Sequence, residues 1–193
     1  MLSLFLIAAA AASPLPADPL AAIRPPCGAA YAGRLASTDA ADADMAGKPL
    51  IMHVRVCDGA EVQIPFHVGE DRSRTWFLSA VDGGYRLKHR HRHADGSLDE
   101  RTLYGGDSVG AATPLPGGGW RVEFPVDAHS KQMFAAQGIP QSMTNVWSVE
   151  YVPGRQWVYQ LARPGRLFRV EFDLTAQVTP PPAPWGDEGA VNR

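Results

Sequence analysis

The chain has little net charge, few cysteines and no long hydrophobic run. Eighteen Lys and Arg residues stand against 20 Asp and Glu residues, so the formal net charge is −2. Nucleic-acid phosphates attract proteins with a strongly basic face, and anionic membrane surfaces attract basic segments. The charge balance therefore argues against a nucleic-acid partner and against electrostatic binding to a membrane.

The longest apolar run is MLSLFLIAAAAA, at residues 1–12. A helix that spans a bilayer needs about 20 apolar residues, so this run is too short and we expect no integral membrane segment. Its length, with small residues at Ala10 and Ala12, is typical of a secretory signal peptide, although no Lys or Arg precedes it. We therefore expect an exported protein, periplasmic or secreted, with residues 1–12 as its signal peptide.

Only two cysteines are present, Cys27 and Cys57. An even number of cysteines in an exported chain predicts a disulfide, which would stabilise the fold by about 3.5 kcal/mol in the chain-entropy model. The pair lacks the C-x-x-C spacing of zinc sites. Two buried free thiols are the alternative.

The length of 193 residues fits one domain, and a hydrophobic share of 45% is enough for a core. Residues 13–27 form a Pro- and Ala-rich lead. Residues 176–193 include TPPPAPWGDEGAVNR, which has too little apolar content to pack, so we expect a Pro-rich flexible tail. The predicted domain therefore covers residues 28–175, and it contains no internal repeat.

Short runs of alternating polar and apolar residues fill this domain. The runs lie at residues 50–57, 61–68, 75–79, 85–93, 98–104, 120–124, 147–151, 157–161 and 168–174. One segment, residues 127–137, instead predicts a helix with Asp127 as N-cap and with Met133 and Phe134 facing inward. Clean alternation is typical of antiparallel strands with one buried face. Because closure removes sheet edges, we expect a mostly β, up-and-down barrel of about nine or ten strands with one short helix; a two-sheet β-sandwich is the alternative.

The strongest local motif is LKHRHRH, at residues 87–93. Side chains alternate between the faces of a strand, so His89 and His91 share one face, and a hairpin turn at Asp95-Gly96 would place Glu100 opposite His91. Two imidazoles and one carboxylate could bind a metal ion, and a haem is the other cofactor considered. The alternatives are a strand that leaves the core for solvent, and a polar inner wall for an anionic or amphipathic ligand.

The opposite face of the same strand is basic and carries Arg86, Lys88, Arg90 and Arg92. These residues could bind an acidic partner, which would make the chain a structural or interaction protein. The alternative is a solvated face with cross-strand ion pairs such as Arg92 with Asp99.

Aromatic residues gather in the second half of the chain, and five of them form the predicted ligand-binding set: Trp147, Tyr151, Trp157, Tyr159 and Phe172. Such residues line ligand cavities, and they equally fill a solid barrel. We favour a non-enzymatic protein that holds a small apolar or amphipathic ligand inside the barrel.

The motif G-x-S-x-G occurs at residues 106–110, around Ser108. A nucleophile elbow needs a helix directly after the serine and a parallel β/α framework. The residues that follow are AATPLPGGG, which cannot form that helix. We therefore identify no catalytic residue and lean towards a protein that is not an enzyme.

Seven segments together resemble a group of small secreted proteins of Gram-negative bacteria. They are HVRVC, VGEDRSRTW, LKHRHRHADG, YGGDS, VEFPVD, NVWSVEYVPG and FRVEFDL, within residues 28–175. The resemblance implies export and a common fold, and it brings no catalytic residues. The strand count also resembles the calycins, the lipocalin and fatty-acid-binding type of barrel, in architecture only, because the lipocalin Gly-x-Trp is absent and fold does not determine function.

Overall fold

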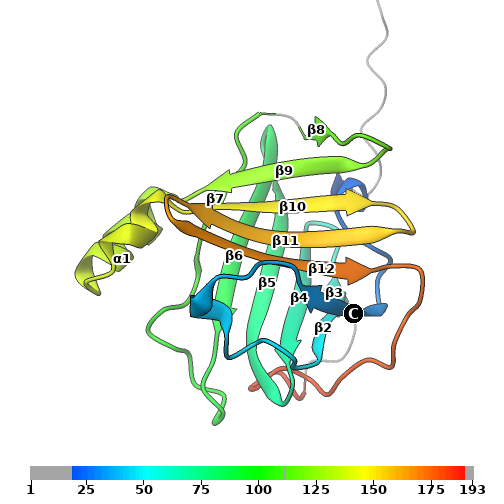
Figure 1. Cartoon of the computed structure of the whole chain (residues 1–193), viewed down its shortest axis with the longest axis horizontal. Helices are drawn as coiled ribbons and strands as arrows, with labels where there is room; N and C mark the ends of the chain where they lie inside the picture. Colours follow the sequence, from blue (N-terminus) through cyan, green and yellow to red (C-terminus); the bar gives the residue numbers. More distant parts are fainter. Residues whose placement is uncertain (1–18, 111, 190–193) are drawn as a thin grey trace, which may run out of the picture.

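A computed structural model describes residues 19–110 and 112–189, and the expected signal peptide at residues 1–12 lies outside these ranges. Within them the chain forms one antiparallel sheet with one α-helix (Figure 1). The strands are β1 (Ala30–Leu35), β2 (Leu50–His53), β3 (Val56–Cys57), β4 (Glu61–Val68), β5 (Asp71–Val81), β6 (Gly84–His91), β7 (Tyr104–Asp107), β8 (Thr113–Pro114), β9 (Trp120–Pro125), β10 (Val146–Val152), β11 (Gln156–Arg163) and β12 (Arg166–Asp173).

The sheet is continuous and curled. Its strand order is β7-β6-β5-β4-β2-β1-β12-β11-β10-β9-β8, with β3 paired to β4 beside this path. Figure 1 shows β4–β7 and β9–β12 as two crossing walls of a half-barrel, which is consistent with the expected calycin-like barrel. The predicted fold class is confirmed, and a single sheet replaces the alternative of a two-sheet sandwich. The sequence pattern missed β1 and β8, and it merged β2 with β3.

The two walls of the half-barrel meet where β7 lies beside the end of β9. The amide of Asp127 donates a hydrogen bond to the carbonyl of Gly105 at 3.0 Å. A Cβ atom on Gly106 would lie 1.8 Å from the carbonyl oxygen of Pro125. Only glycine permits this approach, so Gly106 brings the first and last walls of the half-barrel together.

The core lies inside the curl and is aromatic at one end. Phe66 stacks on Trp76 with ring centroids 4.8 Å apart, and Trp157 and Phe172 pack beside them. The lead segment closes this end, because Ile23 is buried and its carbonyl accepts a hydrogen bond from Trp157 Nε1 at 2.9 Å. Residues 19–27 are therefore packed against the barrel.

The predicted helix is present as α1 (Ala128–Ala136). The Asp127 side chain accepts a hydrogen bond from the Ser130 amide at 2.7 Å, as expected of an N-cap. Phe134 is buried and Met133 is half-buried against the core, as the sequence predicts. The described residues also contain three short 3-10 segments: η1 (Pro19–Ala22), η2 (Ala40–Asp42) and η3 (Pro140–Thr144).

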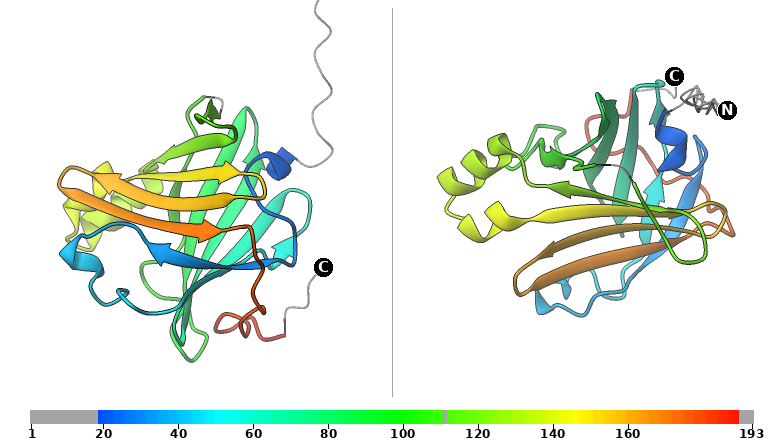
Figure 2. Two further views of the ribbon diagram at one scale, coloured as in Figure 1. Left: turned by 45° about the vertical axis from the view of Figure 1, so that its right-hand side comes forward. Right: turned by 90° about the horizontal axis from the view of Figure 1, so that it is seen from above.

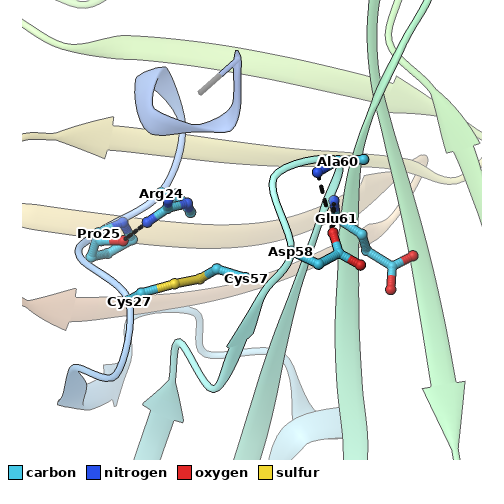
Figure 3. Close-up of a disulfide and its surroundings, with 7 residues drawn as sticks. All are labelled: Arg24, Pro25, Cys27, Cys57, Asp58, Ala60 and Glu61. Atoms are coloured by element: carbon cyan, nitrogen blue, oxygen red, sulfur yellow. Dashed lines mark hydrogen bonds between the residues drawn. A yellow bond between two sulfur atoms is a disulfide. The ribbon is translucent and has the colours of Figure 1, made fainter. Parts of the chain in front are cut away.

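Cys27 and Cys57 form a disulfide, as predicted (Figure 3). Their Cα atoms are 6.3 Å apart and 30 residues separate them in sequence. The bond ties the lead segment to β3. Beside it, Asp58 accepts hydrogen bonds from the amides of Ala60 and Glu61, which shapes the turn into β4.

The C-terminal segment, residues 176–189, crosses the outside of the sheet, and we call it the strap. Val178 bridges to Ala30, Arg72 donates a hydrogen bond to the Ala183 carbonyl at 3.0 Å, and Asp187 forms an ion pair with Arg90. The strap is therefore attached to the sheet, in contrast to the flexible tail that the composition predicts. Ion pairs and backbone hydrogen bonds to distant strands hold the strap, and neither depends on its apolar content.

Candidate functional site

An open cavity of about 410 Å³ lies at the end of the half-barrel opposite the lead segment. The inner faces of β4–β7 and β10–β12 form its walls. Helix α1 and η3 contribute Phe134 and Ser142 to its lining. Figure 2 shows α1 beyond the end of the sheet. The lining residues are Asp42, Met45, Phe66, Arg74, Trp76, His89, His91, Asp99, Arg101, Tyr104, Phe134, Ile139, Ser142, Asn145, Trp147, Tyr159, Leu161, Arg163, Arg166 and Phe168.

A chain of hydrogen bonds between rings crosses the cavity wall. The Tyr159 hydroxyl lies 2.7 Å from His89 Nε2, and His89 Nδ1 lies 3.0 Å from the carbonyl of Tyr104. A carbonyl only accepts, so the proton is on Nδ1, and Nε2 accepts from Tyr159. The Tyr104 hydroxyl in turn lies 3.0 Å from His91 Nε2. The rings are thereby fixed in orientation.

All four rings are uncharged at neutral pH. Burial lowers the pKa of His89 to about 3, and burial with the nearby Arg74 lowers the pKa of His91 to about 4. Burial also raises the pKa of Tyr104 to about 12 and raises that of Tyr159. The inner part of the cavity therefore offers polar but neutral groups.

The remaining inner wall is aromatic. Trp76 stacks on Tyr159 with centroids 4.4 Å apart, and Trp147 lies 5.0 Å from the His89 ring. Phe168 contacts Tyr159 edge-on at 6.0 Å. Flat apolar surfaces of this kind favour an apolar or aromatic ligand.

Charged residues lie towards the mouth. Arg166 forms ion pairs with Asp42 and, at 3.3 Å, with Asp39, which fixes the η2 loop over β12. Arg163 Nη1 donates hydrogen bonds to Ser142 Oγ at 3.3 Å and Asn145 Oδ1 at 3.0 Å. The cavity is therefore amphipathic, with an aromatic interior and an arginine-bearing mouth.

The structure divides the five predicted ligand-binding aromatics. Trp147 and Tyr159 line the cavity. Trp157 and Phe172 are fully buried in the aromatic core, and Tyr151 is buried on the same side of β10 further from the mouth. The half-barrel is thus solid at one end and hollow at the other, and of the five predicted aromatics Trp147 and Tyr159 alone line this cavity.

The predicted metal site at His89, His91 and Glu100 is not assembled. The hairpin expected at Asp95-Gly96 has a different register, since Tyr104 stands opposite His89 in the β6–β7 ladder. Glu100 is exposed in the loop between these strands. Across the described ranges, 19–110 and 112–189, no three His, Cys, Asp or Glu residues are grouped to hold a metal ion.

Each residue of the predicted basic face already has a carboxylate partner. Arg86 pairs with Asp107, Lys88 with Asp127, and both Arg90 and Arg92 with Asp187 of the strap. The expected pair between Arg92 and Asp99 is replaced by the pair with Asp187. This pairing counts against the alternative of a free basic surface for an acidic partner.

Ser108 of the G-x-S-x-G motif has a structural contact. Its hydroxyl accepts a hydrogen bond from the Tyr85 amide at 3.0 Å, directly after β7. The strand that follows in sequence is β8, with no helix between them in the described residues. The elbow geometry is therefore not formed.

Sequence reasoning found part of the cavity, since His89 and His91 lie in its wall, as one alternative predicted. It missed Trp76 and Tyr104, which fall within predicted strands, so the alternation that places Tyr159 inward could have included them. Arg163 gave no comparable signal, because an arginine before a Pro-Gly turn looks like any exposed hairpin residue. Its partners Ser142 and Asn145 come from η3 and the segment after it.

No family model, curated protein or solved structure matches this chain. Within the part of the chain that the structure describes, no helix is long and apolar enough to cross a membrane.

Proposed function

We propose that this protein is a non-enzymatic binding protein that holds one small amphipathic ligand in the cavity of its half-barrel. The observation that carries the proposal is the cavity itself, about 410 Å³ and lined by aromatic rings with oriented polar groups. Ligand pockets of roughly 300–1,000 Å³ with this mixture of surfaces are typical of small-molecule sites.

The hydrogen-bonded tyrosine and histidine side chains of the cavity wall also support a binding function. Hydrogen bonds join Tyr159 to His89, His89 to the Tyr104 carbonyl, and the Tyr104 hydroxyl to His91, so the wall they form is ordered before any ligand arrives. Preorganised walls lower the entropic cost of binding.

The test is a fluorescence titration with the uncharged probe N-phenyl-1-naphthylamine, which brightens in apolar sites. We expect one site per chain in the wild-type protein. Leu161 lines the cavity, so Leu161→Trp fills it and should weaken binding at least about tenfold, equivalent to 1.4 kcal/mol.

The matched control is Leu167→Trp, the same change at a side chain that is 44% exposed and outside the cavity. It should leave the affinity within about twofold of wild type. An equal loss of probe affinity in both variants, or no binding of the probe to the wild-type protein, would contradict the proposal.

We also propose that the protein acts in the periplasm or outside the cell. The Cys27–Cys57 disulfide supports this location, since disulfides persist in oxidising compartments. The apolar run at residues 1–12 supports it from the sequence. Cell fractionation combined with thiol alkylation tests this location. We expect the chain in the envelope or the medium, with both cysteines in the disulfide and therefore resistant to alkylation. A reduced, alkylated chain in the cytoplasm would contradict the proposal.

A further inference from the structure

We infer that the ligand is an amphipathic anion, with its oxyanion (a carboxylate, sulfonate or phosphate) at Arg163 and its apolar body along the inner face of β11. The inference rests on the proposed function and names the chemical class of the ligand for the same cavity. It stands on the partners of the cavity arginines and on the order of side chains along β11.

Arg163 has unused hydrogen-bonding capacity. Its two hydrogen bonds both come from Nη1, and both acceptors, Ser142 Oγ and Asn145 Oδ1, are neutral. A guanidinium carries five N–H donors in a planar fork. Among the residues that the structure describes, Nε and Nη2 of Arg163 have no hydrogen-bond partner, so one edge of the fork is available to an oxyanion.

The neighbouring arginines differ from Arg163 in this respect. Arg74 contacts Asp71 at 2.5 Å, and Arg166 contacts both Asp42 and Asp39. Arg101, the fourth arginine of the lining, is exposed, where solvent and salt screen its charge. Among the half-buried arginines of the cavity, Arg163 is therefore the one that forms no ion pair with a described carboxylate.

The surroundings of Arg163 favour an anion. Partial burial, followed by the positive charge of Arg166, lowers the pKa of the Arg163 guanidinium, and the carboxylate of Asp39, which is paired with Arg166, offsets only part of this effect. Ser142 and Asn145 hold the guanidinium at the mouth without supplying negative charge. An oxyanion there would form charge-assisted hydrogen bonds, which are about twice as strong as neutral ones.

The order of side chains on β11 defines where the apolar body lies. Tyr159, Leu161 and Arg163 alternate with outward residues and all three line the cavity, so they run from the inner wall to the mouth. At about 3.3 Å per residue, Tyr159 lies roughly 13 Å inward of Arg163. Trp147 and Phe168 flank this path. A ligand with its head at Arg163 therefore has an apolar body of about this length.

The test compares two competitors that differ in charge and share one alkyl chain. Dodecanoate and dodecan-1-ol each displace N-phenyl-1-naphthylamine from the wild-type protein, below their aggregation limits. We expect dodecanoate to compete at least about tenfold better. In Arg163→Gln this preference should fall to about twofold or less, with the affinity for the uncharged probe unchanged, and Arg163→Lys should keep part of the preference.

The control is Arg34→Gln, which removes the same charge from a side chain that is 72% exposed and outside the cavity. It should keep the full preference for dodecanoate. Equal competition by acid and alcohol in the wild-type protein, or an undiminished preference in Arg163→Gln, would overturn the anion inference and leave the proposed function standing. Failure of the uncharged probe to bind the wild-type protein would overturn both.

Discussion

The hydroxyl of Tyr159 on β11 donates a hydrogen bond to Nε2 of His89 on β6, across the interior of the half-barrel, at 2.7 Å. The bond links the two walls of the curled sheet at the inner end of the cavity. Because burial keeps His89 neutral, its Nε2 is an acceptor with a single available donor, and the wall depends on that donor. The stability of the fold and the shape of the site therefore share this contact.

Tyr159→Phe should destabilise the protein by about 1–3 kcal/mol, since it leaves His89 Nε2 buried without a donor. Urea denaturation followed by circular dichroism measures the change. Tyr151→Phe is the matched control, because the Tyr151 side chain is mostly buried but its hydroxyl forms no hydrogen bond with another described residue. A loss from Tyr159→Phe no larger than that from Tyr151→Phe would show that the contact does not hold the walls together.

The buried histidines predict the dependence of stability on pH. Burial lowers the pKa of His67 to about 4, in addition to the values of about 3 and 4 for His89 and His91. As the pH falls, these histidines are therefore protonated in the unfolded chain, near pH 6.5, before they are protonated in the folded protein. Stability is at its full value above that pH and falls as the pH drops towards 4, by up to about 1.4 kcal/mol per pH unit for each histidine.

Urea midpoints measured from pH 7 to pH 4.5 test this dependence, in a range above the ordinary carboxylate pKa values. His67→Gln should make the decline shallower, whereas His129→Gln, at an exposed position on α1, should not change it. A flat profile between pH 7 and pH 4.5 would contradict the neutral, buried state of these rings.

Asp187→Asn should release the strap from the outer face. Asp187 and its partner Arg90 are 14% and 13% exposed, so the substitution leaves a mostly buried guanidinium without its carboxylate. We expect a loss of about 1.5–3 kcal/mol, and faster proteolysis within the strap. Asp107→Asn, in the half-exposed pair with Arg86, should cost less than about 1 kcal/mol; equal effects would argue that the strap is not held by this pair.

Removing the disulfide should destabilise the fold through the unfolded chain. The 30-residue separation of Cys27 and Cys57 corresponds to about 3.5 kcal/mol in the chain-entropy model. The double variant with both residues replaced by Ser should match the wild-type protein under reducing conditions. A double variant as stable as the oxidised wild type would mean that the packing of the lead segment alone suffices.

Local patterns in the sequence were enough to predict most elements of the fold. Asp127 followed by a mixed apolar segment predicted α1 and its cap, because an N-cap interaction involves residues only three apart. Alternation likewise predicted the inward faces of β10, β11 and β12. These features depend on neighbours along the chain.

Features set by loop geometry or by distant residues could not be predicted. The turn after β6 involves His93 and Gly96, but Leu103 adopts a left-handed backbone, and Tyr104 rather than Thr102 then pairs with His89. The register also differs beside the turn, where Arg92 bridges to Leu98 and the Asp99 amide donates to the His91 carbonyl, so Glu100 does not stand opposite His91. The strap and the Arg163 site depend instead on partners far away in sequence.

The most direct test of the central claim is native mass spectrometry of the oxidised protein titrated with dodecanoate. The cavity predicts one adduct per chain for the wild-type protein and for Leu167→Trp, and a loss of that adduct in Leu161→Trp, where the added ring occupies the space of the ligand. Identical adduct patterns in all three proteins, or no adduct on the wild-type protein, would contradict the assignment of this cavity as the binding site.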